Sequence, residues 1–154
     1  MIESPGLRGA RLVLLALVPI LALAVVHMAT GPWRAQVQAE AAVTVDTLSD
    51  LDAAQRAAMV EDLAQAEGAP GVVALDRIWM VATLAIAGIL GATLPPALSA
   101  MAATNGISAI GAGIALGLWM TDRASLYDAG DWRLIAASVV LATGLHLLRR
   151  RRHR

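Results

Sequence analysis

The chain of 154 residues contains no cysteine, no lysine and no phenylalanine, and few of its residues carry a charge. Without cysteine it forms no disulfides, thiolate metal sites, thiol redox centres or c-type haem attachments. Charged types make up 16% and hydrophobic types 58% of the residues, whereas a soluble domain carries about 25% and roughly 45–50%. Residues 12–33 and 78–121 contain no Asp, Glu, Lys or Arg. Runs of this length exclude a soluble globular domain and indicate a small integral membrane protein.

The first uncharged run predicts a membrane-spanning helix over residues 12–30, because a span needs about 20 mostly apolar residues. Arg8 and Arg11 precede it, and Gly-Pro-Trp at 31–33 follows it. Pro19 removes one backbone donor inside the helix, a loss that membrane helices tolerate.

The same segment also fits a signal peptide, since a basic start and small residues near 38–41 flank the apolar stretch. Its uncharged stretch is long for a signal peptide, whose apolar region is typically about 7–15 residues. We therefore favour a retained span, with residues 1–11 forming a cytoplasmic N-terminus. Cleavage near residue 40 would leave three spans.

The polar segment at 31–77 carries eight acidic and three basic residues after its first uncharged positions. A hydroxyl residue at Thr47 or Ser49 stands three positions before an acid, which predicts the start of a helix over about 50–67. Asp52 and Arg56 have the spacing of an ion pair on that helix. Glycine and proline at 68–71 predict its end. This segment is expected to be a solvated helix near the bundle or a docking element for a partner.

The second uncharged run is too long for one helix and contains Pro95-Pro96 near its middle. It predicts a span over 78–94, a cytoplasmic turn over 95–105 and a span over 106–121, whose helix could begin as early as Ala97. A loop over 122–131 and a fourth span over 132–148 follow, and an Arg-rich tail occupies 149–154.

Basic residues predict the orientation, because short cytoplasmic loops are enriched in arginine and lysine. Arg8 and Arg11 precede the first span, and the tail after the last span holds five more arginines. Four spans place both basic ends on one side, which we expect to be the cytoplasm. The segments 31–77 and 122–131 are then extracytoplasmic. The Ala-rich, Lys-free composition is typical of GC-rich bacterial genes, so we expect a bacterial inner (cell) membrane.

These patterns predict an all-α fold: an integral membrane four-helix bundle with one extracytoplasmic helical segment. Gly88, Gly91, Gly113 and Gly117 are candidate helix-packing positions, since small residues let membrane helices approach closely. Packing within the chain and packing against another subunit both remain open. The arginines of the tail are candidate lipid and topology anchors, namely Arg149, Arg150, Arg151 and Arg152.

The sequence offers no catalytic, cofactor-binding or metal-binding residue. No acidic or basic residue interrupts an apolar core, which argues against ion-coupled transport. In the predicted topology His27 and His146 lie at opposite membrane surfaces, so one subunit cannot bring them to one haem iron. Both are expected to be interfacial residues without a ligand role. No hydrolase, metalloprotease or nucleotide-binding motif occurs, and the Arg tail alone is weak support for nucleic-acid binding.

We therefore expect a non-catalytic accessory, assembly or stabilising subunit of a larger membrane complex, without cofactors. Its expected partners are the lipid bilayer and other membrane subunits or a second copy, and no nucleic acid. The alternative is a small oligomeric transporter, pore or holin-like protein. Such a path would need polar lining, for which the spans offer only Thr83, Thr93, Ser99, Thr104, Asn105, Ser108, Ser138 and Thr143.

Overall fold

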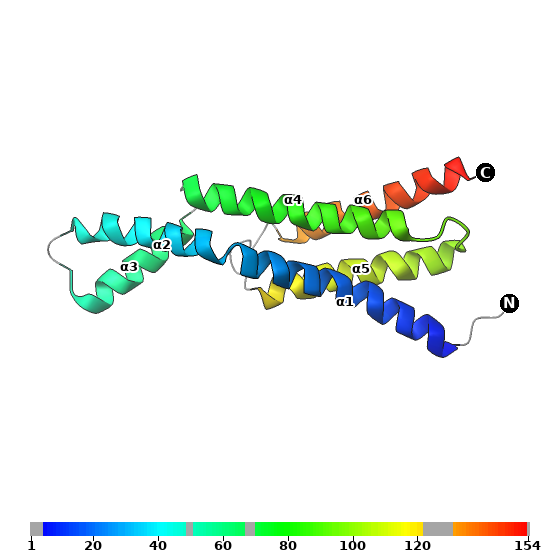
Figure 1. The fold of residues 1–154 in the computed structure, drawn as a ribbon, viewed down its shortest axis with the longest axis horizontal. Helices are drawn as coiled ribbons and strands as arrows, with labels where there is room; N and C mark the ends of the chain where they lie inside the picture. The colour runs from blue at the N-terminus through cyan, green and yellow to red at the C-terminus, as the bar shows by residue number, and fades with distance from the viewer. Residues whose placement is uncertain (1–4, 49–50, 67–69, 122–130, 154) are drawn as a thin grey trace. The chain divides into compact units, whose positions relative to one another are not determined.

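The computed structural model describes residues 5–48, 51–66, 70–121 and 131–153, and these fold into six α-helices (Figure 1). Within these ranges there is no β-strand, so the predicted all-α fold is confirmed. The helices in chain order are α1 (Pro5–Ala29), α2 (Gly31–Asp46), α3 (Ala53–Gln65), α4 (Pro70–Thr93), α5 (Ala100–Met120) and α6 (Asp131–Arg152).

Four of the described helices are long and apolar enough to cross a membrane. They are Gly6–Ala29 in α1, Pro70–Thr93, Ala100–Met120 and Trp132–Arg152 in α6, with 21 to 24 residues each. At about 1.5 Å per residue such helices reach roughly 31–36 Å, which spans a hydrocarbon core of about 30 Å. The chain is thus an all-helical membrane protein with four helices of spanning length.

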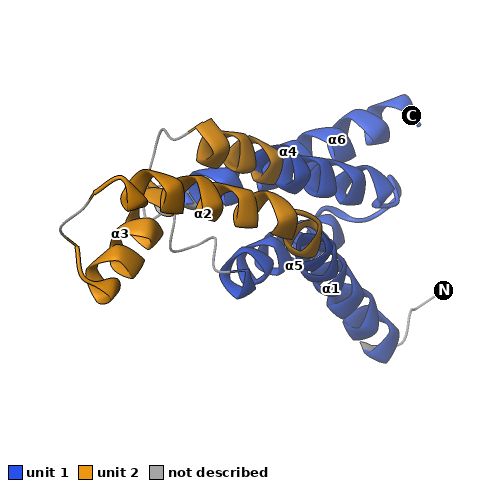
Figure 2. Cartoon of the chain, turned by 60° about the vertical axis from the view of Figure 1, so that its left-hand side comes forward, with its two compact units in different colours: residues 1–25, 80–154 blue, residues 26–79 orange. Residues whose placement is uncertain are grey.

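The chain divides into two compact units (Figure 2). Unit 1 comprises residues 1–25 and 80–154, and unit 2 comprises residues 26–79. All four long helices contribute to the buried core of unit 1. Its apolar members include Leu23, Ala87, Leu90, Ile110, Ile114, Leu118 and Ala142.

The contacts between α1 and α5 give their relative direction within unit 1. Leu15 of α1 contacts Gly106 of α5, and Leu23, further along α1, contacts Gly117, further along α5. The two helices therefore run parallel, as the first and third spans of an alternating bundle must. As a result, the beginning of α1, the α4–α5 connection and the end of α6 lie at the same end of unit 1 (Figure 1).

Unit 2 holds α2, α3 and the first turns of α4, and α2 packs against α3. Its buried apolar residues are Ala41, Val45, Val72, Leu75 and Trp79. A Cβ atom on Gly71 would lie 2.6 Å from Val37 Cγ2, so the glycine allows α4 to start close against α2.

The polar segment is more helical than the sequence predicts, since α2 fills much of the stretch before the predicted helix at 50–67. Only Thr30 separates α1 from α2, because Pro32 falls in the first turn of α2, where a missing N–H is harmless. The alanines and glutamines that follow favour a helix.

The start of α3 also differs from the prediction. Its N-cap is Asp52, whose side chain accepts a hydrogen bond from Gln55 N at 2.8 Å, while Gln55 Oε1 accepts from Asp52 N at 3.1 Å. This is a capping box built on Asp and Gln. Thr47 instead follows α2 and donates its hydroxyl to Thr44 O at 2.6 Å, and Ser49 lies outside the described residues.

The helices that contain the second and third predicted spans begin before those spans, and the start of α5 lies within the range that the sequence left open. Pro70, expected to help end a helix, begins α4, so this helix starts well before residue 78. The connection predicted over 95–105 is shorter, because α5 begins at Ala100 with Ser99 as its N-cap. Ser99 Oγ accepts a hydrogen bond from Ala102 N at 3.3 Å, which satisfies a free donor of the first turn.

The last helix extends past the predicted end at residue 148, because α6 continues to Arg152. Arginine is a good helix former, and its charge is favourable near a helix C-terminus. Of the predicted loop over 122–131, only Asp131 belongs to the described residues, as the first residue of α6.

Candidate functional site

The two predicted packing glycines of α5 lie against α1. A Cβ on Gly113 would lie 2.6 Å from Pro19 Cγ and would also collide with the Ala16 carbonyl oxygen. A Cβ on Gly117 would lie 2.8 Å from Leu23 Cδ1. Both glycines are buried, so this face of α5 packs within the chain and offers no free surface to another subunit.

The two predicted packing glycines of α4 lie against α6. A Cβ on Gly91 would lie 2.5 Å from Ala142 Cα and 2.6 Å from its carbonyl oxygen, so the two backbones are in direct contact. A Cβ on Gly88 would lie 3.3 Å from Leu145 Cδ1 and 3.6 Å from Leu141 Cδ2. Side chains line the Gly88 contact, whereas backbone atoms line the Gly91 contact.

A different face of α5 exposes small and weakly polar residues, together with the larger Met101 and Leu116. Thr104, Ser108 and Ala112 are spaced four residues apart and all three are exposed. The Thr104 hydroxyl donates to Ala100 O at 2.8 Å, so it is satisfied within its own helix. Small residues at this spacing form a shallow groove that a second membrane helix can approach closely. We call these three residues the outer stripe of α5.

The arginines expected to anchor the chain form the last turn of α6. The Arg149 guanidinium donates from Nη1 to the carbonyl oxygen of Ala92, next to the end of α4. This hydrogen bond satisfies a carbonyl that the end of the helix leaves free, and it places positive charge at the negative end of the helix dipole. Arg149 therefore links two helices of unit 1, beyond the expected role as an anchor.

His27 lies where α1 ends and belongs to unit 2. Arg34 of α2 donates from Nη2 to His27 O at 2.8 Å, and its Nη1 lies 3.0 Å from His27 Nδ1. The His27 ring also meets the Trp79 ring edge-on, with 6.4 Å between the centroids. Since a guanidinium only donates hydrogen bonds, the imidazole nitrogen that accepts from it carries no proton. Arg34 thus caps α1 and orients His27.

His146 is buried within unit 1, since only 2% of it is exposed. No described residue gives either ring nitrogen a hydrogen-bond partner. The fully buried Thr83 hydroxyl also finds no partner among the described residues. Ser138, two turns before His146 on α6, is equally buried but donates to Leu134 O at 2.8 Å. Buried polar groups without partners are costly, so His146 and Thr83 stand out in unit 1.

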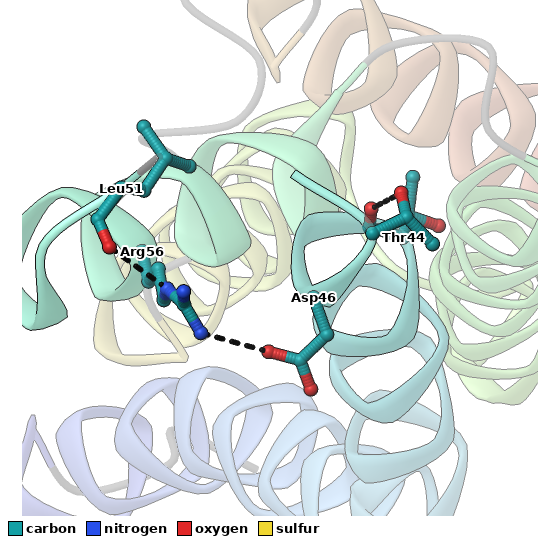
Figure 3. A network of polar contacts seen from close by, with 5 residues as sticks. Thr44, Asp46, Leu51 and Arg56 are labelled. Carbon is teal, nitrogen blue, oxygen red and sulfur yellow. Dashed lines mark hydrogen bonds and ion pairs between the residues drawn. The ribbon is translucent and has the colours of Figure 1, made fainter. Parts of the chain in front are cut away.

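The predicted ion pair between Asp52 and Arg56 is replaced by another. Arg56 Nη1 lies 3.7 Å from Asp46 Oδ1, and Arg56 Nε donates to Leu51 O at 3.0 Å (Figure 3). Asp52 is instead engaged in capping α3. Because Asp46 ends α2, the Arg56 side chain joins the two helices of unit 2 across their connection. Both partners are solvent-exposed, so this pair adds little stability.

Among the described residues, no three His, Asp or Glu side chains gather closely enough to hold a metal ion. Comparison with known proteins gives no assignment either: no family model matches the chain, and no curated protein or solved structure is significantly similar to it. The features that remain as candidates are the outer stripe of α5, the buried His146 and the basic end of unit 1.

Proposed function

We propose that this chain is a non-catalytic accessory, assembly or stabilising subunit of a larger complex in a bacterial inner membrane. The outer stripe of α5 is the observation that carries the proposal. The glycine faces of α4 and α5 are already occupied by helices of the same chain. Thr104, Ser108 and Ala112 remain exposed, and their small size suits close packing of a helix from another subunit.

A small oligomeric pore is the second candidate, and the same stripe favours it for another reason. Thr104 and Ser108 carry hydroxyls, and the neighbouring Asn105 is exposed as well. Several copies arranged around these polar groups would line a path for water or ions. The two candidates make different demands on Ser108: a packing surface needs its small volume, whereas a pore lining needs its hydroxyl.

Two substitutions of Ser108 separate these candidates. For an accessory subunit we expect Ser108→Ala to retain co-purification of the partner proteins in mild detergent, because the volume stays small. Ser108→Leu should weaken it, because the larger side chain separates the helices. Ala137→Leu, at an exposed small position on α6, is the matched control and should have no effect.

The measurement is the yield of co-purified proteins per folded subunit, with membrane levels determined in parallel. Full partner recovery with Ser108→Leu would contradict the role proposed for the outer stripe. Loss of cellular function with Ser108→Ala, at normal membrane levels and partner recovery, would support the pore instead.

The proposed orientation places both termini in the cytoplasm, since arginines cluster at the two ends of the chain. Reporter fusions at residue 55 and at residue 127, which lies outside the described residues, should then report an extracytoplasmic position. Fusions at either terminus should report the cytoplasm. A cytoplasmic signal from residue 55 would contradict the orientation, and a mature chain starting near residue 40 would favour the signal peptide.

A further inference from the structure

A groove of about 670 Å³ opens at the basic end of unit 1, between the start of α1 and the α4–α5 connection. Arg8 and Arg11 line it from α1, and Ser99 and Asn105 line it from the start of α5. None of the described residues that line it is acidic. The remaining lining residues carry no polar side chain and include Leu12, Leu15, Leu94, Leu98 and Ala102.

The lining of the groove changes from charged to apolar along α1. Arg8 and Arg11 precede the uncharged run, and Leu12 and Leu15 lie in its first turns. On α5 the lining extends from Ser99 to Gly106, roughly 10 Å along the helix at 1.5 Å per residue. The charged part therefore belongs at the depth of lipid headgroups, and the apolar part belongs at the depth of the acyl chains.

We propose that this groove binds one anionic phospholipid of the surrounding leaflet. The lipid phosphate lies against Arg8 and Arg11, whose planar guanidinium groups match a phosphate in shape and charge. Ser99, at the shallow end of the α5 lining, supplies a further polar contact to the headgroup, and the acyl chains follow the leucines that line the deeper part. This site is independent of the proposed accessory role.

The arginines of the α6 tail provide the comparison that distinguishes a site from a charged surface. They lie at the same end of unit 1 and carry the same charge, but none of them lines this groove. If attraction to the membrane surface were the whole effect, two tail arginines would matter as much as Arg8 and Arg11.

The test uses the purified full-length chain in detergent, with bound lipids counted by native mass spectrometry during titration. We expect one phosphatidylglycerol per chain, bound in preference to phosphatidylcholine. Arg8→Gln with Arg11→Gln should weaken phosphatidylglycerol binding roughly 25-fold, since each arginine near a phosphate contributes about a factor of five. Arg151→Gln with Arg152→Gln removes the same charge outside the groove and should change the affinity less than about threefold.

A second variant tests the apolar part without changing the charge. Ala102→Leu fills the groove and should weaken phosphatidylglycerol binding even if the arginine variant fails to fold. Millimolar inorganic phosphate should not displace the lipid, because it lacks acyl chains. The proposal is overturned if both arginine pairs weaken binding equally, if phosphate displaces the lipid, or if phosphatidylcholine binds as well as phosphatidylglycerol.

Discussion

Gly91→Ala should lower the free energy of unfolding by about 2–3 kcal/mol, and Gly113→Ala should have an effect of similar size. The added Cβ at Gly91 would lie 2.5 Å from Ala142 Cα, so a backbone must move before the methyl fits. At Gly113 the methyl would meet the Ala16 carbonyl and Pro19 Cγ. Neither obstacle is a flexible side chain, so relief requires that whole helices separate and lose contact along their length.

Gly144 of α6 is the matched control, because an added Cβ there has no neighbour within 4 Å among the described residues. Gly144→Ala should raise stability by roughly 0.5–1 kcal/mol through helix propensity alone. Unfolding in mixed micelles, followed by circular dichroism, measures all three variants under one condition. Equal stability of the Gly91, Gly113 and Gly144 variants would mean that the close helix contacts of unit 1 are absent in the bilayer.

The sequence predicts the four long helices directly, because a long run without charged residues indicates a membrane span whatever packs against it. Residues 12–33 contain no acid, lysine or arginine, and α1 covers most of that run. The ends of helices depend on finer chemistry. Pro70 was expected to stop a helix, but a proline is equally suited to the first turn, where it begins α4.

The sequence could identify the small residues but could not assign their partners. Gly113 and Gly117 form a motif that fits a neighbour in the same chain or in another, and only the structure places α1 against them. The sequence likewise could not assign the partners of the polar contacts in unit 2. Arg56 stands at a suitable spacing from Asp52, but the capping of α3 engages Asp52 and leaves Asp46 as the ion-pair partner.

The outer stripe of α5 can be recognised only when the structure shows which faces of α5 are buried. Thr104, Ser108 and Ala112 repeat every four residues in the sequence, as do several other small residues of this alanine-rich chain. Their exposure distinguishes them from the buried glycines, and exposure follows from packing rather than from residue type. The sequence therefore identifies Thr104 and Ser108 as polar residues of a span, and only the structure shows that they share an exposed face with Ala112.

His146→Leu should leave the chain folded and should raise its free energy of unfolding by about 1–2 kcal/mol, because it removes a buried group that lacks hydrogen bonds. Leucine has a similar volume, so the surrounding residues need little rearrangement. Thr83→Val, which removes the unpartnered Thr83 hydroxyl without a change of shape, should shift stability in the same direction. Ser138→Ala is the contrasting control: its hydroxyl bonds to Leu134 O, so its loss should bring no gain.

Cellular activity and the free energy of unfolding must both be measured for His146→Leu, because together they distinguish a packing role from a chemical role. An accessory subunit binds through many small contacts, so His146→Leu should retain cellular activity along with its higher stability. Proteins keep costly buried polar groups where chemistry or ion coupling needs them. If His146→Leu abolishes activity while membrane levels and unfolding free energy stay normal or rise, His146 carries chemistry and the accessory role is wrong. Retained activity in that stabilised variant would support helix packing as the main role of the spans.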